Sequence, residues 1–140
     1  MVFLSLESCL NPPEYDVVPQ ITLMNTSPLE LNQQSDSLTI QFSFTDGDGD
    51  LGLKTTESGS NVCLFDSRLA NNFCYEYRIP YIEPRGNVKA ISGDVSIVVP
   101  SITCIPGHLT DTLQYRIQIT DRSGNLSNSI TTPKIILHCQ

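Results

Sequence analysis

The feature that most constrains the fold is a strict alternation of apolar and polar side chains in two stretches of the chain. In residues 37–45 (SLTIQFSFT) and 112–120 (TLQYRIQIT), every second side chain is apolar. Successive side chains of a β-strand point to opposite faces of a sheet, so this period of two predicts strands with one buried face. No stretch of the sequence has a convincing helical period, which favours an all-β fold.

Five further segments have strand-like composition and are separated by Gly, Pro, Asn and Asp. Pro80 inside one of them indicates a sheet edge, because proline cannot donate a hydrogen bond to a ladder. Seven short strands with such turns predict an immunoglobulin-like antiparallel β-sandwich over residues 19–140. The expected strands are residues 19–25, 37–45, 61–65, 75–82, 94–99, 112–120 and 130–137.

Size and charge exclude several classes of protein. The chain has 140 residues and a net charge of −7, with 15 acidic against 8 basic residues. This length is that of one ordinary domain. An acidic surface does not attract a phosphate backbone, and no apolar run approaches the roughly 20 residues of a membrane-spanning helix. We therefore expect neither a nucleic-acid binder nor an integral membrane protein.

The N-terminus resembles the end of a bacterial lipoprotein signal. Residues 1–9 (MVFLSLESC) are mostly apolar and place a small residue directly before Cys9, the position that carries the acyl chains in such proteins. The stretch lacks a charged start and a full apolar region, so an ordinary N-terminus with a stray cysteine is the alternative. Residues 10–18 are rich in proline and predict a flexible tether. The membrane contact we expect is a lipid anchor at Cys9 alone.

Four cysteines remain if Cys9 is lipidated, and they contain no CxxC motif of a redox or zinc site. Cys63 and Cys74 flank a polar stretch typical of a hairpin loop. Cys104 precedes an expected strand whose partner strand ends beside Cys139. We therefore expect the disulfides Cys63–Cys74 and Cys104–Cys139 in an oxidising compartment. Buried free thiols are the alternative.

One loop carries the pattern of a metal site. Asp46, Asp48 and Asp50 alternate with glycines in FTDGDGDLG, directly after a strong strand. Carboxylates this close repel one another unless a cation neutralises them, and Ca²⁺ takes six to eight oxygen ligands. Glu57 stands where an EF-hand places its last ligand, but Leu51 replaces the required glycine and strands replace the helices. The loop is therefore not an EF-hand.

A second loop, DRSGN, supplies candidate ligands in Asp121 and Asn125. In an immunoglobulin-like sandwich the loops after the second and sixth strands lie at the same end. The expected cofactor is therefore a calcium ion held by the residues Asp46, Asp48, Asp50, Asp121 and Asn125. Two alternatives need no metal: a salt bridge from Arg122 to one aspartate, or a solvated Asp-Gly turn.

Two patterns involve tyrosines. Asp111 and Tyr115 have the Asp-x-x-x-Tyr spacing of a tyrosine corner, in which the hydroxyl bonds back to the backbone. An ordinary core tyrosine is the alternative. Tyr75, Tyr77 and Tyr81 share the parity of one strand face and are the candidates for a carbohydrate-binding surface. An inward core face would explain them equally well.

No motif of catalysis is present. His108 lies in a Pro-Gly turn and His138 stands beside Cys139, and neither belongs to a spacing that names a base or a zinc site. We expect the protein not to be an enzyme.

Three runs carry a family resemblance: SFTDGDGDLGL, YRIPYIEPRGNVKAISGDVSI and DTLQYRIQITDRSGNLSNSITTPKI. They resemble small envelope lipoproteins of Bacteroidetes-type bacteria, over most of residues 40–136, with DGDGDLG and DRSGNLSN as the most specific parts. The resemblance implies an anchored immunoglobulin-like sandwich on the periplasmic or cell-surface side, without catalytic residues.

The function that we expect is a non-enzymatic, lipid-anchored binding or structural module of the cell envelope, with a protein or glycan as its partner. The calcium ion would stiffen one pole of the sandwich. The alternative is an accessory carbohydrate-binding module of a nutrient-uptake system, which requires exposed aromatic side chains on one sheet face.

Overall fold

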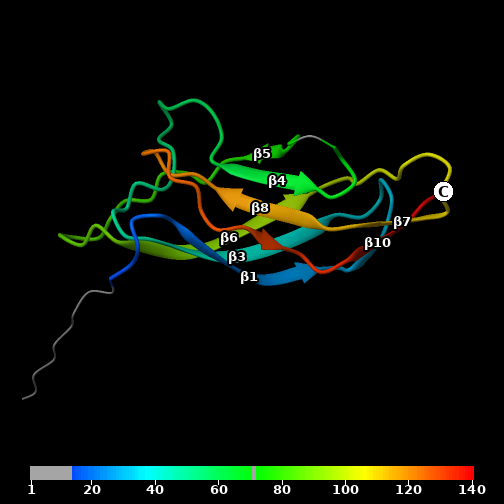
Figure 1. The fold of residues 1–140 in the computed structure, drawn as a ribbon, viewed down its shortest axis with the longest axis horizontal. Helices are drawn as coiled ribbons and strands as arrows, with labels where there is room; N and C mark the ends of the chain where they lie inside the picture. The colour runs from blue at the N-terminus through cyan, green and yellow to red at the C-terminus, as the bar shows by residue number, and fades with distance from the viewer. Residues whose placement is uncertain (1–13, 71) are drawn as a thin grey trace, which may run out of the picture.

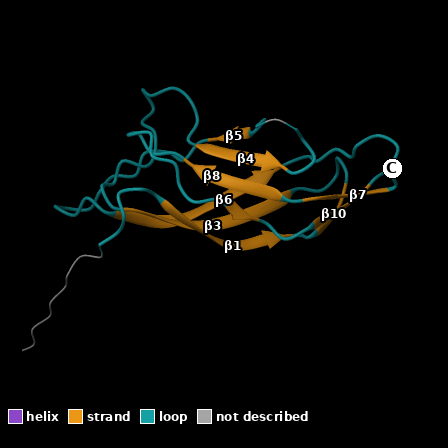
Figure 2. Cartoon of the chain, in the orientation of Figure 1, coloured by secondary structure: helices purple, strands orange, loops and turns teal. Residues whose placement is uncertain are grey.

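The structure, a computed structural model, describes residues 14–70 and 72–140, and every regular element in this part of the chain is a β-strand (Figure 2). No helix able to cross a membrane occurs within these residues. The strands are β1 (Gln20–Ser27), β2 (Glu30–Asn32), β3 (Leu38–Asp46), β4 (Val62–Asp66), β5 (Tyr75–Tyr77), β6 (Ile91–Val99), β7 (Thr110–Leu113), β8 (Tyr115–Ile119), β9 (Ile130–Thr131) and β10 (Ile135–His138).

The strands form a sandwich of sheets, which confirms the expected all-β class. Their orders are β1-β3-β6, β5-β4-β8-β9 and β2-β10-β7. Figure 1 shows β1, β3 and β6 in one layer with β4, β5 and β8 in the other, while β7 and β10 extend toward one end. The pairs are antiparallel except β2 with β10, which run parallel.

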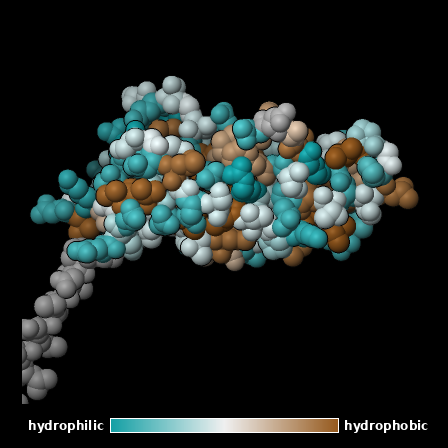
Figure 3. All heavy atoms as spheres, in the orientation of Figure 1, coloured by the Kyte–Doolittle hydropathy of each residue, from teal (hydrophilic) through white to brown (hydrophobic). Residues whose placement is uncertain are grey.

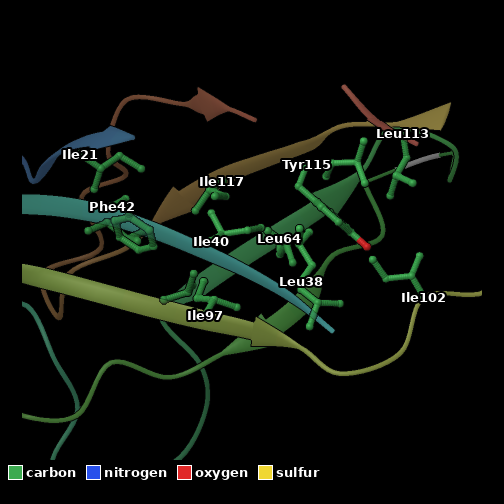
Figure 4. Packing of buried hydrophobic residues seen from close by; sticks show 14 of the residues in the cluster. Ile21, Leu38, Ile40, Phe42, Leu64, Ile97, Ile102, Leu113, Tyr115 and Ile117 are labelled. Carbon is green, nitrogen blue, oxygen red and sulfur yellow. The ribbon is translucent and has the colours of Figure 1, made fainter. Parts of the chain in front are cut away.

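The core follows from the alternation in the sequence. Leu38, Ile40, Phe42 and Phe44 of β3 are buried, and the polar residues between them face outward. Figure 4 shows Leu38, Ile40 and Phe42 packed against side chains of the opposite layer. Among these are Leu64 of β4 and Tyr115 and Ile117 of β8. Burying each such side chain contributes about 1.5–3 kcal/mol to the stability of the fold.

The expected strand 112–120 is interrupted where the chain changes sheets. β7 pairs with β10 and β8 pairs with β4. Gln114 lies between them, and Ser67 completes its backbone bonds: the Gln114 N–H donates to the Ser67 hydroxyl (2.9 Å), and the Ser67 N–H donates to the Gln114 carbonyl (3.0 Å). Side-chain alternation continues through the interruption, so the sequence does not reveal it.

Other boundaries also differ from the sequence-based expectation. β2 was not expected, because three residues are too few to show a period. The expected strand 75–82 ends at Tyr77, and Pro80 keeps only an isolated bridge to Leu53. The last expected strand divides into β9 and β10 around Pro133, which has no N–H to donate.

Two disulfides join the cysteines of the described region. Cys63 pairs with Cys74, with 5.3 Å between their Cα atoms, and Cys104 pairs with Cys139, with 5.8 Å. Both expected pairings are confirmed, and they indicate an oxidising, non-cytoplasmic compartment. Cys9 and the expected signal remnant lie outside the described residues.

The surface gives no large apolar patch on the face drawn in Figure 3, where hydrophobic side chains are scattered among hydrophilic ones. The outward side chains of β6, such as Asp94 and Ser96, are mostly polar.

Candidate metal centre

Two loops far apart in the sequence meet at one end of the sandwich. Residues 46–52 begin at the end of β3, and residues 121–125 follow β8 (Figure 1). The Arg122 N–H donates to the Asp50 carbonyl oxygen (3.2 Å), and the Ser123 hydroxyl donates to the Asp50 carboxylate. The expectation that these loops share an end is confirmed, and we call the two loops together the aspartate pole.

Four carboxylates converge at the aspartate pole. One oxygen from each of Asp46, Asp48, Asp50 and Asp121 lies within 4.8 Å of the other three. Ca²⁺ binds oxygens at about 2.3–2.6 Å, so opposite ligands of one ion lie about 5 Å apart. A single metal ion can therefore contact all four aspartates.

Asp46 is the most unusual member of the cluster, because its side chain is fully buried. Oδ2 accepts a hydrogen bond from the Leu51 N–H (2.8 Å), but Oδ1 is buried with no hydrogen-bond partner in the described part of the chain. Burial raises the pKa of Asp46 to about 7; the Leu51 N–H opposes this shift, and the neighbouring Asp48 and Asp50 add to it. A buried polar atom without a partner is costly, so the position of this oxygen favours binding of a cation or a proton.

Asp50 and Asp46 have opposite pKa shifts. Burial opposes ionisation of Asp50 as well, but hydrogen bonding by Ser123 keeps the pKa of Asp50 below its ordinary value. Its Oδ1 is a second buried carboxylate oxygen that no described residue hydrogen-bonds. In the metal-free cluster Asp46 therefore keeps its proton to a higher pH than Asp50 does.

Asp121 is oriented by Asn125. The Asn125 N–H donates to Asp121 Oδ1 (2.7 Å), and the Asn125 side-chain amide donates to Oδ2 (2.9 Å). Asp121 is 6% exposed, so these bonds fix a nearly buried carboxylate toward the other loop. Asn125 was expected among the ligands, and in the structure its N–H groups position Asp121.

The proposed salt bridge from Arg122 to the acidic loop is wrong. The Arg122 guanidinium lies 4.0 Å from Glu57 and 5.1 Å from the centre of the Tyr81 ring. Lys54 lies over the same ring at 5.0 Å. Within the described residues no Lys, Arg or His side chain forms an ion pair with the four aspartates.

Close backbone packing explains two of the glycines in DGDGDLG. Gly47 donates its N–H to the Asp16 carbonyl (2.8 Å), and a Cβ there would lie 2.2 Å from the Tyr15 carbonyl oxygen. Gly49 has φ of +68°, and its Cβ would lie 2.0 Å from the Lys89 carbonyl oxygen. The loop is thus held on both sides by other segments of the chain, and side chains at these positions are excluded.

Two asparagines that sequence reasoning missed hold the surrounding loops. Asn61 pairs its side-chain amide with the backbone N–H and carbonyl of Ile79, at 2.7 and 3.1 Å. Asn128 does the same with Ile21, at 2.8 and 2.9 Å. Each side-chain amide thus makes the two backbone hydrogen bonds that a neighbouring strand would otherwise make. An asparagine in a loop is too common for its sequence position to reveal this role.

Glu57 and the histidines lie apart from the centre. Glu57 accepts a hydrogen bond from the Lys54 N–H (2.6 Å) and is not a member of the aspartate cluster, in agreement with the rejection of an EF-hand. His138 pairs with Glu30 near the C-terminus, and His108 is exposed in its turn.

The expected tyrosine corner is not formed. Asp111 accepts hydrogen bonds from Arg68 and from the Ile105 N–H, and no described backbone group bonds the Tyr115 hydroxyl. Tyr115 is instead a core residue, 1% exposed. Of the three surface candidates, Tyr75 and Tyr77 belong to β5, whereas Tyr81 lies beyond it between Lys54 and Arg122.

The sequence matches no known family model. No curated protein is significantly similar to it either.

Proposed function

We propose that the chain is a non-enzymatic, lipid-anchored module of the cell envelope whose aspartate pole binds a calcium ion. The observation that carries this proposal is that Asp46 is clustered with three other carboxylates while its buried Oδ1 has no partner among the described residues. Removing this oxygen from water is unfavourable unless a cation or a proton compensates it.

The donor set favours calcium over other metals. All four candidate ligands are carboxylates, and hard oxygen ligands suit Ca²⁺ and Mg²⁺ rather than zinc or copper. Mg²⁺ demands near-ideal octahedral geometry, whereas Ca²⁺ accepts irregular sets from flexible loops. Asp48 is exposed and Asp50 half-buried, so water can complete the coordination.

Calcium would join the two loops of the pole and remove their mutual repulsion. Asp46, Asp48 and Asp50 come from one loop and Asp121 from the other, so one ion connects the end of β3 with the end of β8. Extracellular calcium modules bind with dissociation constants of about 10⁻⁴–10⁻³ M. The two disulfides support the same compartment.

The proposed anchor at Cys9 would place the aspartate pole toward the membrane. Asp16 and Tyr15 contact Gly47 within the pole, so the described chain enters the domain at this end. The opposite end, with β7 and β10, would then face away from the membrane and toward a partner (Figure 1). The partner that we propose is a protein or a glycan of the envelope.

Calorimetric titration with calcium chloride tests the metal site. We expect one binding event and a rise in melting temperature with calcium, both lost in Asp46→Asn. Asp94→Asn is the matched control, because Asp94 is an exposed aspartate on β6 outside the cluster. No heat and no change in melting temperature at millimolar calcium would contradict the proposal.

Mass spectrometry of the protein purified from its native membrane tests the anchor. We expect acyl chains on Cys9 and release of the domain into the soluble fraction in Cys9→Ala. An unmodified Cys9 in that material contradicts the anchor and leaves the calcium site unaffected.

A further inference from the structure

A second feature lies at the far end of β6 from the aspartate pole. β6 pairs Ile91 with Asp46 at the pole and Val99 with Leu38 at its other end. Beyond Val99, residues 99–106 and the edge strand β5 enclose a cavity of about 490 Å³, with Tyr115 among its lining residues. Pockets for small ligands have volumes of about 300–1,000 Å³.

Tyr115 brings an unpaired hydroxyl to this cavity. The residue is 1% exposed, and no described residue hydrogen-bonds its hydroxyl. Figure 4 shows that the hydroxyl points away from Ile117 and toward Ile102, which lines the same cavity. This hydroxyl is not one of the fully buried atoms that lack a partner among the described residues, so it is open to the cavity, where water or a bound ligand can hydrogen-bond it.

Apart from Arg68, the polar side chains that line the cavity all carry hydroxyls. Four further lining residues, Tyr75, Tyr77, Ser101 and Thr103, carry hydroxyls without a hydrogen bond to any described residue. Two of the neighbouring backbone N–H groups are already used: that of Cys104 donates to the Gln33 side chain (3.2 Å), and that of Ile105 donates to Asp111 (3.1 Å). An added peptide strand would need such N–H groups free.

The cavity carries no free positive charge. Arg68 lines it, but its guanidinium lies 2.7 Å from Asp66 and 2.7 Å from Asp111, and it also donates to the Thr103 carbonyl (2.9 Å). The lining residues Val99, Pro100, Ile102 and Pro106 supply apolar surface. An anionic ligand would therefore meet no unpaired cation, and the protein carries a net charge of −7.

We infer that this cavity binds a neutral carbohydrate. Sugar hydroxyls both donate and accept hydrogen bonds, as the five protein hydroxyls do. The C–H faces of a sugar ring match the tyrosine rings and the apolar wall. This site is independent of calcium at the aspartate pole. It includes two of the three tyrosines considered on sequence grounds, excludes Tyr81, and adds Tyr115.

An NMR titration of the isotope-labelled protein tests the inference. The probes are the neutral disaccharides maltose, cellobiose, lactose and N,N′-diacetylchitobiose, with digalacturonic acid as the anionic comparison. We expect at least one neutral disaccharide to shift the amide signals of residues 99–105 saturably, and the acid to leave them in place. If no neutral probe shifts these signals at tens of millimolar, or the acid binds more tightly, the inference is wrong.

Variants separate binding in the cavity from contact elsewhere. Tyr115→Phe keeps the ring in the core and removes the hydroxyl, so we expect about three- to tenfold weaker binding of the active disaccharide, the loss of one hydrogen bond. Tyr75→Ala removes an exposed ring from the wall of the cavity and should weaken binding more than Tyr115→Phe does. Tyr81→Phe is the control and should bind like the unmodified protein. Unchanged affinity in both cavity variants would overturn the inference.

Discussion

Buried aspartates lie at both ends of the sandwich, but a basic side chain pairs with them at one end only within the described residues. At one end, Asp66 and Asp111 lie against Arg68, and their side chains are 1% and 12% exposed. At the aspartate pole, Asp46 is equally buried and no described basic side chain pairs with it. At the first end Arg68 balances the charge of the buried aspartates. At the second end Asp46 needs a cation from solution or a proton. A buried carboxylate is thus informative about ligands only once its partners are known.

The largest effect is expected from replacing Arg68, the basic side chain that pairs with Asp66 and Asp111. Arg68→Gln leaves Asp66 and Asp111 facing each other without a counter-charge, and breaking a buried ion pair from one side costs about 3–5 kcal/mol. Urea unfolding should show this loss of unfolding free energy. Arg85→Gln, an exposed arginine, is the control. A loss no larger than that of the control would show that the Arg68 cluster is not a stabilising element.

Calcium should act at the other end only. At a hundredfold excess over its dissociation constant, calcium should raise the unfolding free energy by about 2.7 kcal/mol. Asp46→Asn should abolish most of this gain, while Arg68→Gln should retain it because Arg68 lies away from the pole. Thermal unfolding with and without calcium measures the difference. Loss of the calcium effect in Arg68→Gln would break the proposed independence of the two ends.

The two ends should also respond to pH with opposite signs. The folded-state pKa of Asp46 is raised to about 7 from 3.8, so the folded protein binds the extra proton and the metal-free domain should lose stability as pH rises from about 4 to 7. The pKa of Asp111 is lowered, chiefly by Arg68 against the effect of burial, so its contribution is lost as pH falls below its ordinary pKa. Unfolding curves in a chelator, with Asp46→Asn as control, should separate the first effect.

The smallest effect concerns the residue that orients Asp121. Asn125→Ala removes the amide bond to Oδ2 but keeps the backbone N–H bond to Oδ1, so we expect about tenfold weaker calcium binding without loss of the site. Arg122→Gln should leave calcium affinity unchanged, because its guanidinium lies against Glu57 and Tyr81. Calorimetry that ranks these two variants in the reverse order would contradict the assigned roles.

The strands and the disulfides were accessible from the sequence because they depend on local periodicity and on simple pairing. The inward row from Leu38 to Phe44 and the row from Leu113 to Ile119 are buried as expected. The aspartates of the pole could be grouped because a sandwich brings the two loops together. The calcium ion, the lipid anchor and the family resemblance stay predictions.

The features that sequence reasoning missed depend on contacts between distant residues. Arg68 lies in a stretch expected to be a polar hairpin loop, yet it reaches Asp111, 43 positions away. That contact occupies Asp111, one of the two residues of the expected tyrosine corner. Arg122 follows Asp121 directly, but its side chain leaves the pole for Tyr81. The local sequence pattern does not indicate which partner Arg68 or Arg122 contacts.

The hydrogen bond between Gly47 and Asp16 has a mechanical consequence. Any tension transmitted along the chain from residues before Glu14 first reaches the sandwich at this bond, ahead of β1. Gly47 stands between two of the clustered aspartates, so a pull on the N-terminal segment acts directly on the loop that would grip the ion. The domain would then resist stretching better with its loop loaded than empty.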